Sequence, residues 1–172
     1  SQQIIDTYPN IENISSFEII SMKQNRGHAR CIASGLKYIF EKKEFDFVIP
    51  MDGDGEDRPE EITNFIQLSE QSSEKSIIGE RIKRSEGIIF KACYQFHKFL
   101  TLAFTGQSIK FGNFTCLSKS TVKKLLEEKA TWNSFSGSLK KIEKDLISIP
   151  STRGKRYFGP SQMSFFLSLI HI

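Results

Sequence analysis

The stretch that decides the fold has the sequence FDFVIPM at residues 45–51, and DGDGED follows directly at residues 52–57. The first part is almost continuously apolar, which is typical of a strand buried on both faces in a parallel sheet. The second part is acidic, and its two glycines allow the backbone to turn so that several carboxylates lie close together. We therefore expect a buried strand that ends in an acidic loop.

Strands and helices are expected to alternate on both sides of this stretch, because short β-rich runs are followed by apolar residues at helical spacing. The expected strands are residues 17–22, 45–51, 76–79, 111–117 and 143–150, and the expected helices are residues 29–40, a segment from Pro59 onward, 86–105 and 119–128. This alternation predicts an α/β fold of three layers with a mainly parallel sheet.

Composition restricts the class of protein. The chain has 172 residues, of which 38% are hydrophobic, and this is enough for one core and one domain. Its 24 Lys and Arg residues are interleaved with 20 Asp and Glu residues, so no basic block favours a nucleic-acid partner. Three widely spaced cysteines suggest neither a disulfide framework nor a zinc site.

The acidic loop is a candidate cation site. Asp52, Asp54 and Glu56 alternate with glycines after a strand, and open α/β sheets bind ligands beyond the carboxyl ends of their strands. Such carboxylates suit Mg²⁺ or Mn²⁺. The alternative interpretation is a polar turn in which Asp57 and Glu60 cap the following helix, because they have the spacing of a capping box. A calcium EF-hand does not fit, because that loop requires Gly and Glu at its sixth and twelfth positions.

Two basic groups could bind a diphosphate. Arg81 and Arg84 follow the expected strand 76–79 and should open onto the same side of the sheet as the acidic loop. Arg153 and Arg156, with Lys155 between them, lie in an expected mobile loop. Each group could instead be an ordinary charged surface, and the second could be a positive patch beside a membrane. The histidines, including His28, lack the spacing of metal ligands and are expected to be structural or surface residues.

Several motifs in order resemble one known family. They are Asn25-x-Gly27-x-Ala29, the run IPMDGDGEDRPEE at residues 49–61, Gly79-x-Arg81, FGNF at residues 111–114, and RGKRYxGxSQMSF at residues 153–165. Together they resemble the family 2 glycosyltransferases of GT-A fold, closest to the polyprenyl-phosphate sugar synthases such as the dolichol-phosphate mannosyltransferases. The resemblance covers roughly residues 15 to 170.

The resemblance implies roles for individual residues. Asp54, Arg81 and Arg156 are expected to be catalytic, and Asp52, Asp54 and Glu56 to hold Mg²⁺ or Mn²⁺. The donor is expected to be bound by Asp52 together with the following residues: Asn25, Gly27, Arg84 and Ser161. Residues 1–80 would form the nucleotide-sugar half of a single domain spanning residues 1–172, and residues 81–172 the acceptor half.

The resemblance also implies a reaction and a place in the cell. A hexose would pass from a nucleotide-diphosphate sugar to a polyprenyl phosphate or glycan at the cytoplasmic face of a membrane, with inversion and with help from the metal. Nothing before Phe17 supplies the strand with which the family begins, so we expect a catalytic domain truncated at both ends. A phosphate acceptor is already ionised and needs no base, and no obvious base lies between residues 105 and 140. Two alternatives remain: a non-catalytic binding module of the same fold, and a basic protein that binds nucleic acid.

Overall fold

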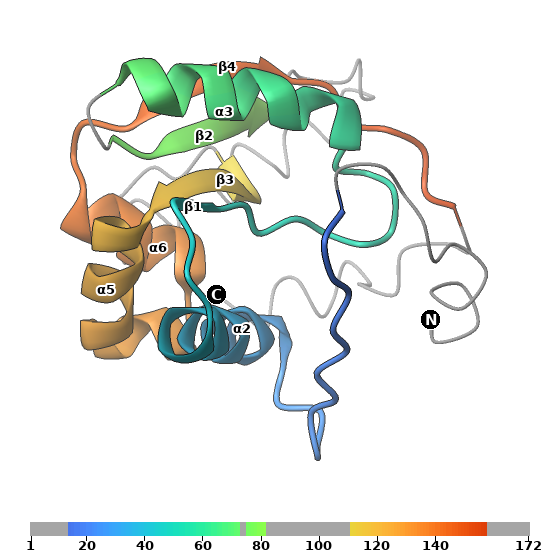
Figure 1. Cartoon of the computed structure of the whole chain (residues 1–172), viewed down its shortest axis with the longest axis vertical. Coiled ribbons are helices and arrows are strands. Elements are labelled where there is room, and N and C mark those ends of the chain that lie inside the picture. Colours follow the sequence, from blue (N-terminus) through green and yellow to red (C-terminus); the bar gives the residue numbers. More distant parts are fainter. Residues whose placement is uncertain (1–13, 73–74, 82–110, 158–172) are drawn as a thin grey trace, which may run out of the picture.

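The computed structural model describes residues 14–72, 75–81 and 111–157, and Figure 1 shows how their elements are arranged. In chain order these are α2 (His28–Lys42), β1 (Phe47–Val48), the 3₁₀ helix η1 (Pro59–Glu61), α3 (Ile62–Gln71), β2 (Ile77–Arg81), β3 (Phe111–Ser118), α5 (Lys119–Glu127), the 3₁₀ helix η2 (Lys129–Trp132), α6 (Phe135–Ile142) and β4 (Ile147–Ser151).

The four strands form one sheet in the order β1-β3-β2-β4. β3 is antiparallel to both of its neighbours, whereas β4 is parallel to β2. It follows that β1, β2 and β4 all run in one direction and that β3 alone is reversed. The carboxyl ends of β1, β2 and β4 therefore lie at the same edge of the sheet, where the acidic loop begins.

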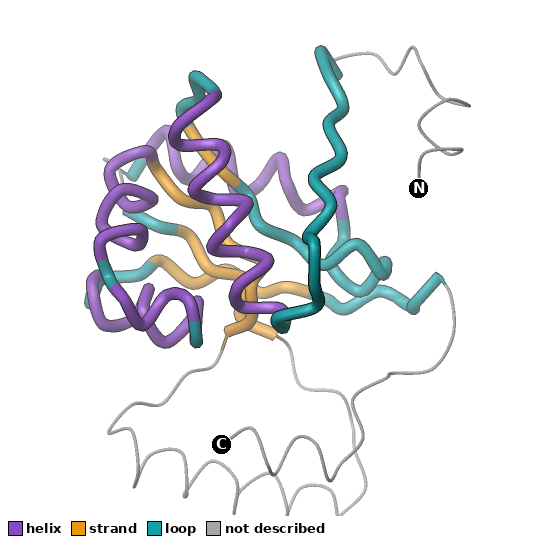
Figure 2. The backbone as a smooth tube through the Cα atoms, turned by 90° about the horizontal axis from the view of Figure 1, so that it is seen from below, coloured by secondary structure: helices purple, strands orange, loops and turns teal. Residues whose placement is uncertain are grey.

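Helices cover both faces of this sheet, which gives the three layers expected from the sequence (Figures 1 and 2). Neighbouring strand residues point to opposite faces. Ile77 and Cys116 pack with Phe65 of α3 on one face. Ile78 and Leu117 pack on the other face with α2, α5 and α6. The alternation of buried residues along β2 and β3 thus divides the core into two clusters.

The two short helices after β3 begin at serine caps. Ser118 Oγ accepts a hydrogen bond from Thr121 N at the start of α5, and Ser134 Oγ accepts one from Gly137 N at the start of α6. Each cap satisfies one amide that the first turn of a helix leaves without a partner. The apolar pattern predicts α5 but neither η2 nor α6. Thr131 is buried in η2, and Phe135 and Leu139 are buried in α6.

Two expected strands are absent or shorter. Residues 17–22 form no strand, because nothing in the described part of the chain pairs with their backbone. They run beside α2 instead, where the carboxylate of Glu18 accepts hydrogen bonds from Tyr38 and Lys43, and Ile19 and Ile20 remain exposed. The strand expected at residues 45–51 is limited to Phe47–Val48. The helix expected at residues 86–105 lies outside the described residues.

Within residues 14–72, 75–81 and 111–157, no helix has the length and apolar character that crossing a bilayer requires.

Candidate active site

The acidic loop at residues 52–57 leaves the carboxyl end of β1 and turns back on itself through two side-chain hydrogen bonds. Asp57 Oδ2 accepts from the amide of Asp52 at 2.8 Å, and Asp54 Oδ1 accepts from the amide of Glu56 at 3.0 Å. Gly55 has a φ of 88°, which favours glycine. The loop therefore has one defined shape, with Glu56 and Asp57 buried.

The capping interpretation of Asp57 and Glu60 is wrong. Neither η1 nor α3 has a side-chain cap, and Arg58 and Glu61 occupy the respective cap positions. Asp57 closes the acidic loop through the amide of Asp52, and Glu60 extends into solvent 3.7 Å from Arg58. Asp57 and Glu60 have the spacing of a capping box, but the carboxylate of Asp57 accepts a hydrogen bond from the amide of Asp52 within the acidic loop instead.

A second segment, residues 153–157, lies directly on the acidic loop. The amide of Gly154 donates to Glu56 O at 2.8 Å, and the amide of Tyr157 donates to Asp54 O at 2.9 Å. Gly154 is so close that a Cβ at this position would lie 2.4 Å from Gly55 O. These residues, which were expected to form a mobile loop, continue from β4 and lie across the acidic loop.

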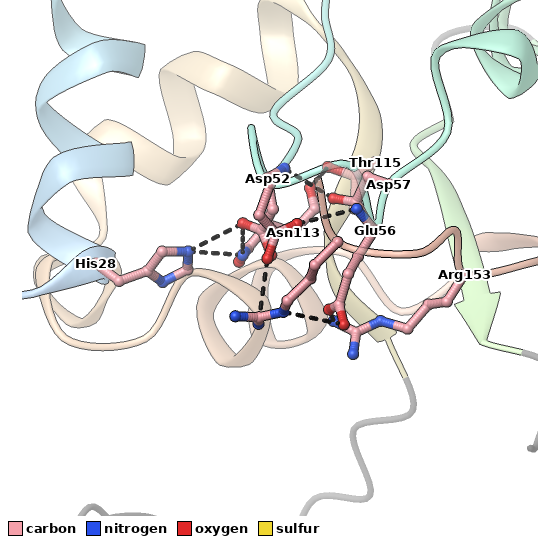
Figure 3. A network of polar contacts seen from close by, with 9 residues as sticks. His28, Asp52, Glu56, Asp57, Asn113, Thr115 and Arg153 are labelled. Carbon is pink, nitrogen blue, oxygen red and sulfur yellow. Dashed lines mark hydrogen bonds and ion pairs between the residues drawn. The ribbon is translucent and has the colours of Figure 1, made fainter. Parts of the chain in front are cut away.

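This segment carries two arginines onto the carboxylates (Figure 3). Arg156 Nη2 lies 3.1 Å from Asp54 Oδ2, and Arg156 Nε lies 3.2 Å from Glu56 Oε1. Arg153 Nη2 lies 2.6 Å from Glu56 Oε2. The side chains are between 11% and 31% exposed, so these ion pairs are less screened by solvent than ordinary surface pairs.

The other side of the loop meets the start of α2 and the middle of the sheet. The side-chain amide of Asn113, on β3, donates to Asp52 Oδ1 at 3.2 Å and lies 2.8 Å from His28 Nε2. His28 Nε2 is itself 3.4 Å from Asp52 Oδ1. In Figure 3, His28 lies on one side of Asp52 and Asn113, and Glu56 and Arg153 lie on the other side. Asp52 thus has a fixed orientation set by two elements far from it in sequence.

The chemistry of the loop fits a hard divalent cation. The loop has four carboxylates, at residues 52, 54, 56 and 57, and Mg²⁺ and Mn²⁺ prefer such oxygen ligands. Those of Asp54 and Glu56 pair with the guanidinium groups of Arg153 and Arg156. The described residues contain no group of three acidic, histidine or cysteine side chains already arranged around one point. The arginines hold the carboxylates in their present positions, so a cation would have to share Asp54 with Arg156.

The sequence of the chain matches a known family. A family model described as glycosyl transferase family 2 matches residues 1–128, which is most of the chain. The chain belongs to this family. It is therefore a glycosyltransferase with a GT-A-like α/β fold, which uses a nucleotide-sugar donor and an acceptor. No curated protein matches the chain.

The remaining predicted residues of this glycosyltransferase lie at the same edge of the sheet or outside the described part. Arg81 is the last residue of β2, and its backbone pairs with Ser151 at the end of β4, just before Arg153. Asn25 accepts a hydrogen bond from the amide of Gly27, which has a φ of 88° and stands at the start of α2. Arg84 and Ser161 lie outside the described residues.

Several residues that contact the acidic loop of this glycosyltransferase were not predicted to do so, because they lie far from the loop in sequence. His28 was expected to be a structural or surface residue; its side chain is 61% exposed, and it also contacts the carboxylate of Asp52. Asn113 was noted only as part of a motif, and Arg153 as part of a basic group that could bind a diphosphate. A signal was available for His28, since it follows Gly27 at the start of a helix whose amino end faces the acidic loop. For Arg153, the sequence contained no signal of its partner.

Proposed function

We propose that this glycosyltransferase moves a hexose from a nucleotide-diphosphate sugar to a polyprenyl phosphate at the cytoplasmic face of a membrane, with Mg²⁺ or Mn²⁺. The observation that carries the donor part is the ion pair of Asp54 with Arg156 at the carboxyl edge of the sheet, in the same loop as Asp52, which Asn113 orients. Carboxylates that hold a cation and an arginine that faces them provide the two kinds of partner that a diphosphate needs.

In this proposal the residues bind and orient, and they do not form a covalent intermediate. Asp52 and Asp54 would hold the cation, which neutralises charge on the diphosphate when it is bound. Arg156 would donate to diphosphate oxygens as the bond between the anomeric carbon and the leaving oxygen breaks. An oxygen of the acceptor phosphate would form the new bond to that carbon from the opposite side, which inverts its configuration.

A phosphate acceptor is supported by a basic groove of about 740 Å³ beside the start of α2. Lys23, Arg26, Arg30 and Trp132 are among its lining residues. In the described part of the chain, none of these three cations forms an ion pair with a carboxylate, so their charge is available to an anion. A glycan acceptor would instead need a base to remove a proton from its hydroxyl group.

The donor site is tested by calorimetric titration of UDP and GDP, each with and without Mn²⁺. We expect one nucleotide to bind in a Mn²⁺-dependent manner, and Asp54→Asn to abolish this binding. Asp145→Asn is the matched control, because it removes the same charge from an exposed residue far along the chain. If neither nucleotide binds to the folded protein, the chain is a non-catalytic relative.

The acceptor is tested separately by transfer of labelled hexose from the preferred nucleotide to polyprenyl phosphate in detergent or to a soluble glycan. We expect transfer to the phosphate and inverted stereochemistry in the product. The rate should depend on pH without the ascending limb that a catalytic carboxylate or histidine base would produce. Transfer to the glycan alone would overturn the polyprenyl-phosphate part and leave the donor site intact.

A further inference from the structure

Glu56 faces the arginines with both of its carboxylate oxygens. Oε1 lies 3.2 Å from Arg156 Nε, and Oε2 lies 2.6 Å from Arg153 Nη2. Its backbone takes part as well, since Glu56 O accepts the hydrogen bond from the amide of Gly154 between the two arginines. Glu56 is only 8% exposed. Together with the two contacts that Asp54 makes to Arg156 and Tyr157, its three contacts join the acidic loop to residues 153–157 at five points.

The three expected metal ligands differ in how many of their carboxylate oxygens contact an arginine. Asp52 is oriented toward Asn113 and His28, away from Arg153. Asp54 is half-buried and has only one oxygen directed at an arginine, because the other accepts from an amide. Among these three residues, Glu56 alone has both oxygens in ion pairs with guanidinium groups, although the contact of Oε2 with Arg153 lacks the geometry of a hydrogen bond. Binding a cation through Glu56 would separate it from two arginines, whereas binding through Asp54 would disturb only one contact.

We propose that Glu56 is a positioning residue for Arg153 and Arg156 and not a ligand of the cation. This inference rests on the proposed function, because the arginines are placed there to receive the donor diphosphate. Held by Glu56, both guanidinium groups stand beside Asp54 before the donor arrives, so little side-chain freedom is lost when it binds.

The arginines keep donors for such a ligand. A guanidinium group has five N–H donors in a planar fork. Glu56 and Asp54 engage Nε and Nη2 of Arg156, and Glu56 engages Nη2 of Arg153. Nε of Arg153 is buried and has no hydrogen-bond partner among the described residues. The pairing with Glu56 therefore fixes the arginines without using up their capacity to bind phosphate oxygens.

The proposal is tested with Glu56→Gln, which preserves the size of the side chain and removes its charge. We would measure the affinity for Mn²⁺ alone, the affinity for UDP and GDP at saturating Mn²⁺, and the rate of trypsin cleavage after Arg153 and Arg156. Glu60→Gln is the matched control, because it makes the same change four residues away at an exposed position.

We expect Glu56→Gln to weaken nucleotide binding by about tenfold and to speed trypsin cleavage, with a loss of Mn²⁺ affinity smaller than about tenfold. The direction of the nucleotide effect is decisive. Loss of a negative charge beside an anionic ligand would by itself strengthen binding. Unchanged or stronger nucleotide binding would therefore overturn the positioning role, and so would a loss of Mn²⁺ affinity of tenfold or more.

Two further variants test the same role independently of Glu56→Gln alone. Glu56→Asp retains the charge but withdraws the carboxylate from the arginines, and we expect weaker nucleotide binding from it as well, even if Glu56→Gln does not fold. Arg156→Ala should weaken nucleotide binding strongly in the wild-type background and only slightly beside Glu56→Gln, because the two residues act together. Strictly additive effects would contradict the proposal. If the wild-type protein binds neither nucleotide, the donor site itself fails; if it binds and Glu56→Gln binds equally, only the role of Glu56 fails.

Discussion

The side-chain amide of Asn113 donates a hydrogen bond to Asp52 across 61 residues of sequence. Asn113 stands on β3, the reversed strand between β1 and β2, so the middle of the sheet directly orients the first carboxylate of the acidic loop. The contact depends on the position of β3 and on no local feature of the loop.

Replacing Asn113 with Ala should weaken Mn²⁺-dependent nucleotide binding by about tenfold, because a hydrogen bond to a charged group is lost and Asp52 is no longer held. Calorimetry with the preferred nucleotide measures the effect. Asn133→Ala is the control, since that side chain is exposed in the turn before α6. Equal affinities of the Asn113 variant and wild type would show that Asp52 needs no orientation from the sheet.

The two glycines of the acidic loop should respond very differently to alanine. Gly55 has a φ of 88°, and a Cβ there would lie 2.7 Å from the ring of Tyr157. Gly55→Ala should lower the free energy of unfolding by about 1 to 3 kcal/mol, through backbone strain and displacement of the tyrosine. A Cβ at Gly53 would meet no atom within 4 Å, so Gly53→Ala should change the free energy of unfolding by less than about 0.5 kcal/mol. Urea denaturation of both variants tests this contrast, and equal stabilities would contradict it.

Adjacent residues of α3 should also differ. Phe65 is fully buried and lies 4.5 Å from Phe114 between ring centroids, whereas Ile66 is 37% exposed. Phe65→Ala should cost about 3 to 5 kcal/mol because it leaves a cavity against the sheet. Ile66→Ala should cost less than about 1 kcal/mol. Thermal or chemical unfolding provides the comparison, and a small loss for Phe65→Ala would mean that α3 does not cover the sheet.

The two described cysteines should react at different rates with iodoacetamide. Cys31 is exposed, whereas burial raises the pKa of the Cys116 thiol, which also accepts a hydrogen bond from Ser69. The thiolate is the reactive form, so a raised pKa and poor access both protect Cys116. At pH 8, peptide mapping should find Cys31 modified in the native protein and Cys116 modified only after unfolding. Comparable native rates would place Cys116 at the surface.

The local pattern of the sequence determined the layers, the helices α2, α3 and α5, and the acidic loop. Apolar periodicity identified α2 and α3, and the run at residues 111–117 identified β3, because side-chain burial repeats with the period of each element. The same logic failed for residues 17–22, since a strand also requires a partner that no local pattern reveals. The 3₁₀ helix η2 and α6 were missed because they are short and their apolar residues are few.

The sequence also indicated candidate residues for the chemistry, whereas tertiary structure alone decided what they contact. Alternating carboxylates after a buried strand indicated a cation site before any contact was known. That Glu56 faces Arg153 and Arg156, and that Asp52 faces His28 and Asn113, depends on where α2, β3 and β4 lie relative to the end of β1. Contacts between residues so distant in the chain arise from the packing of the sheet, and the identity of each residue gives no record of its partner.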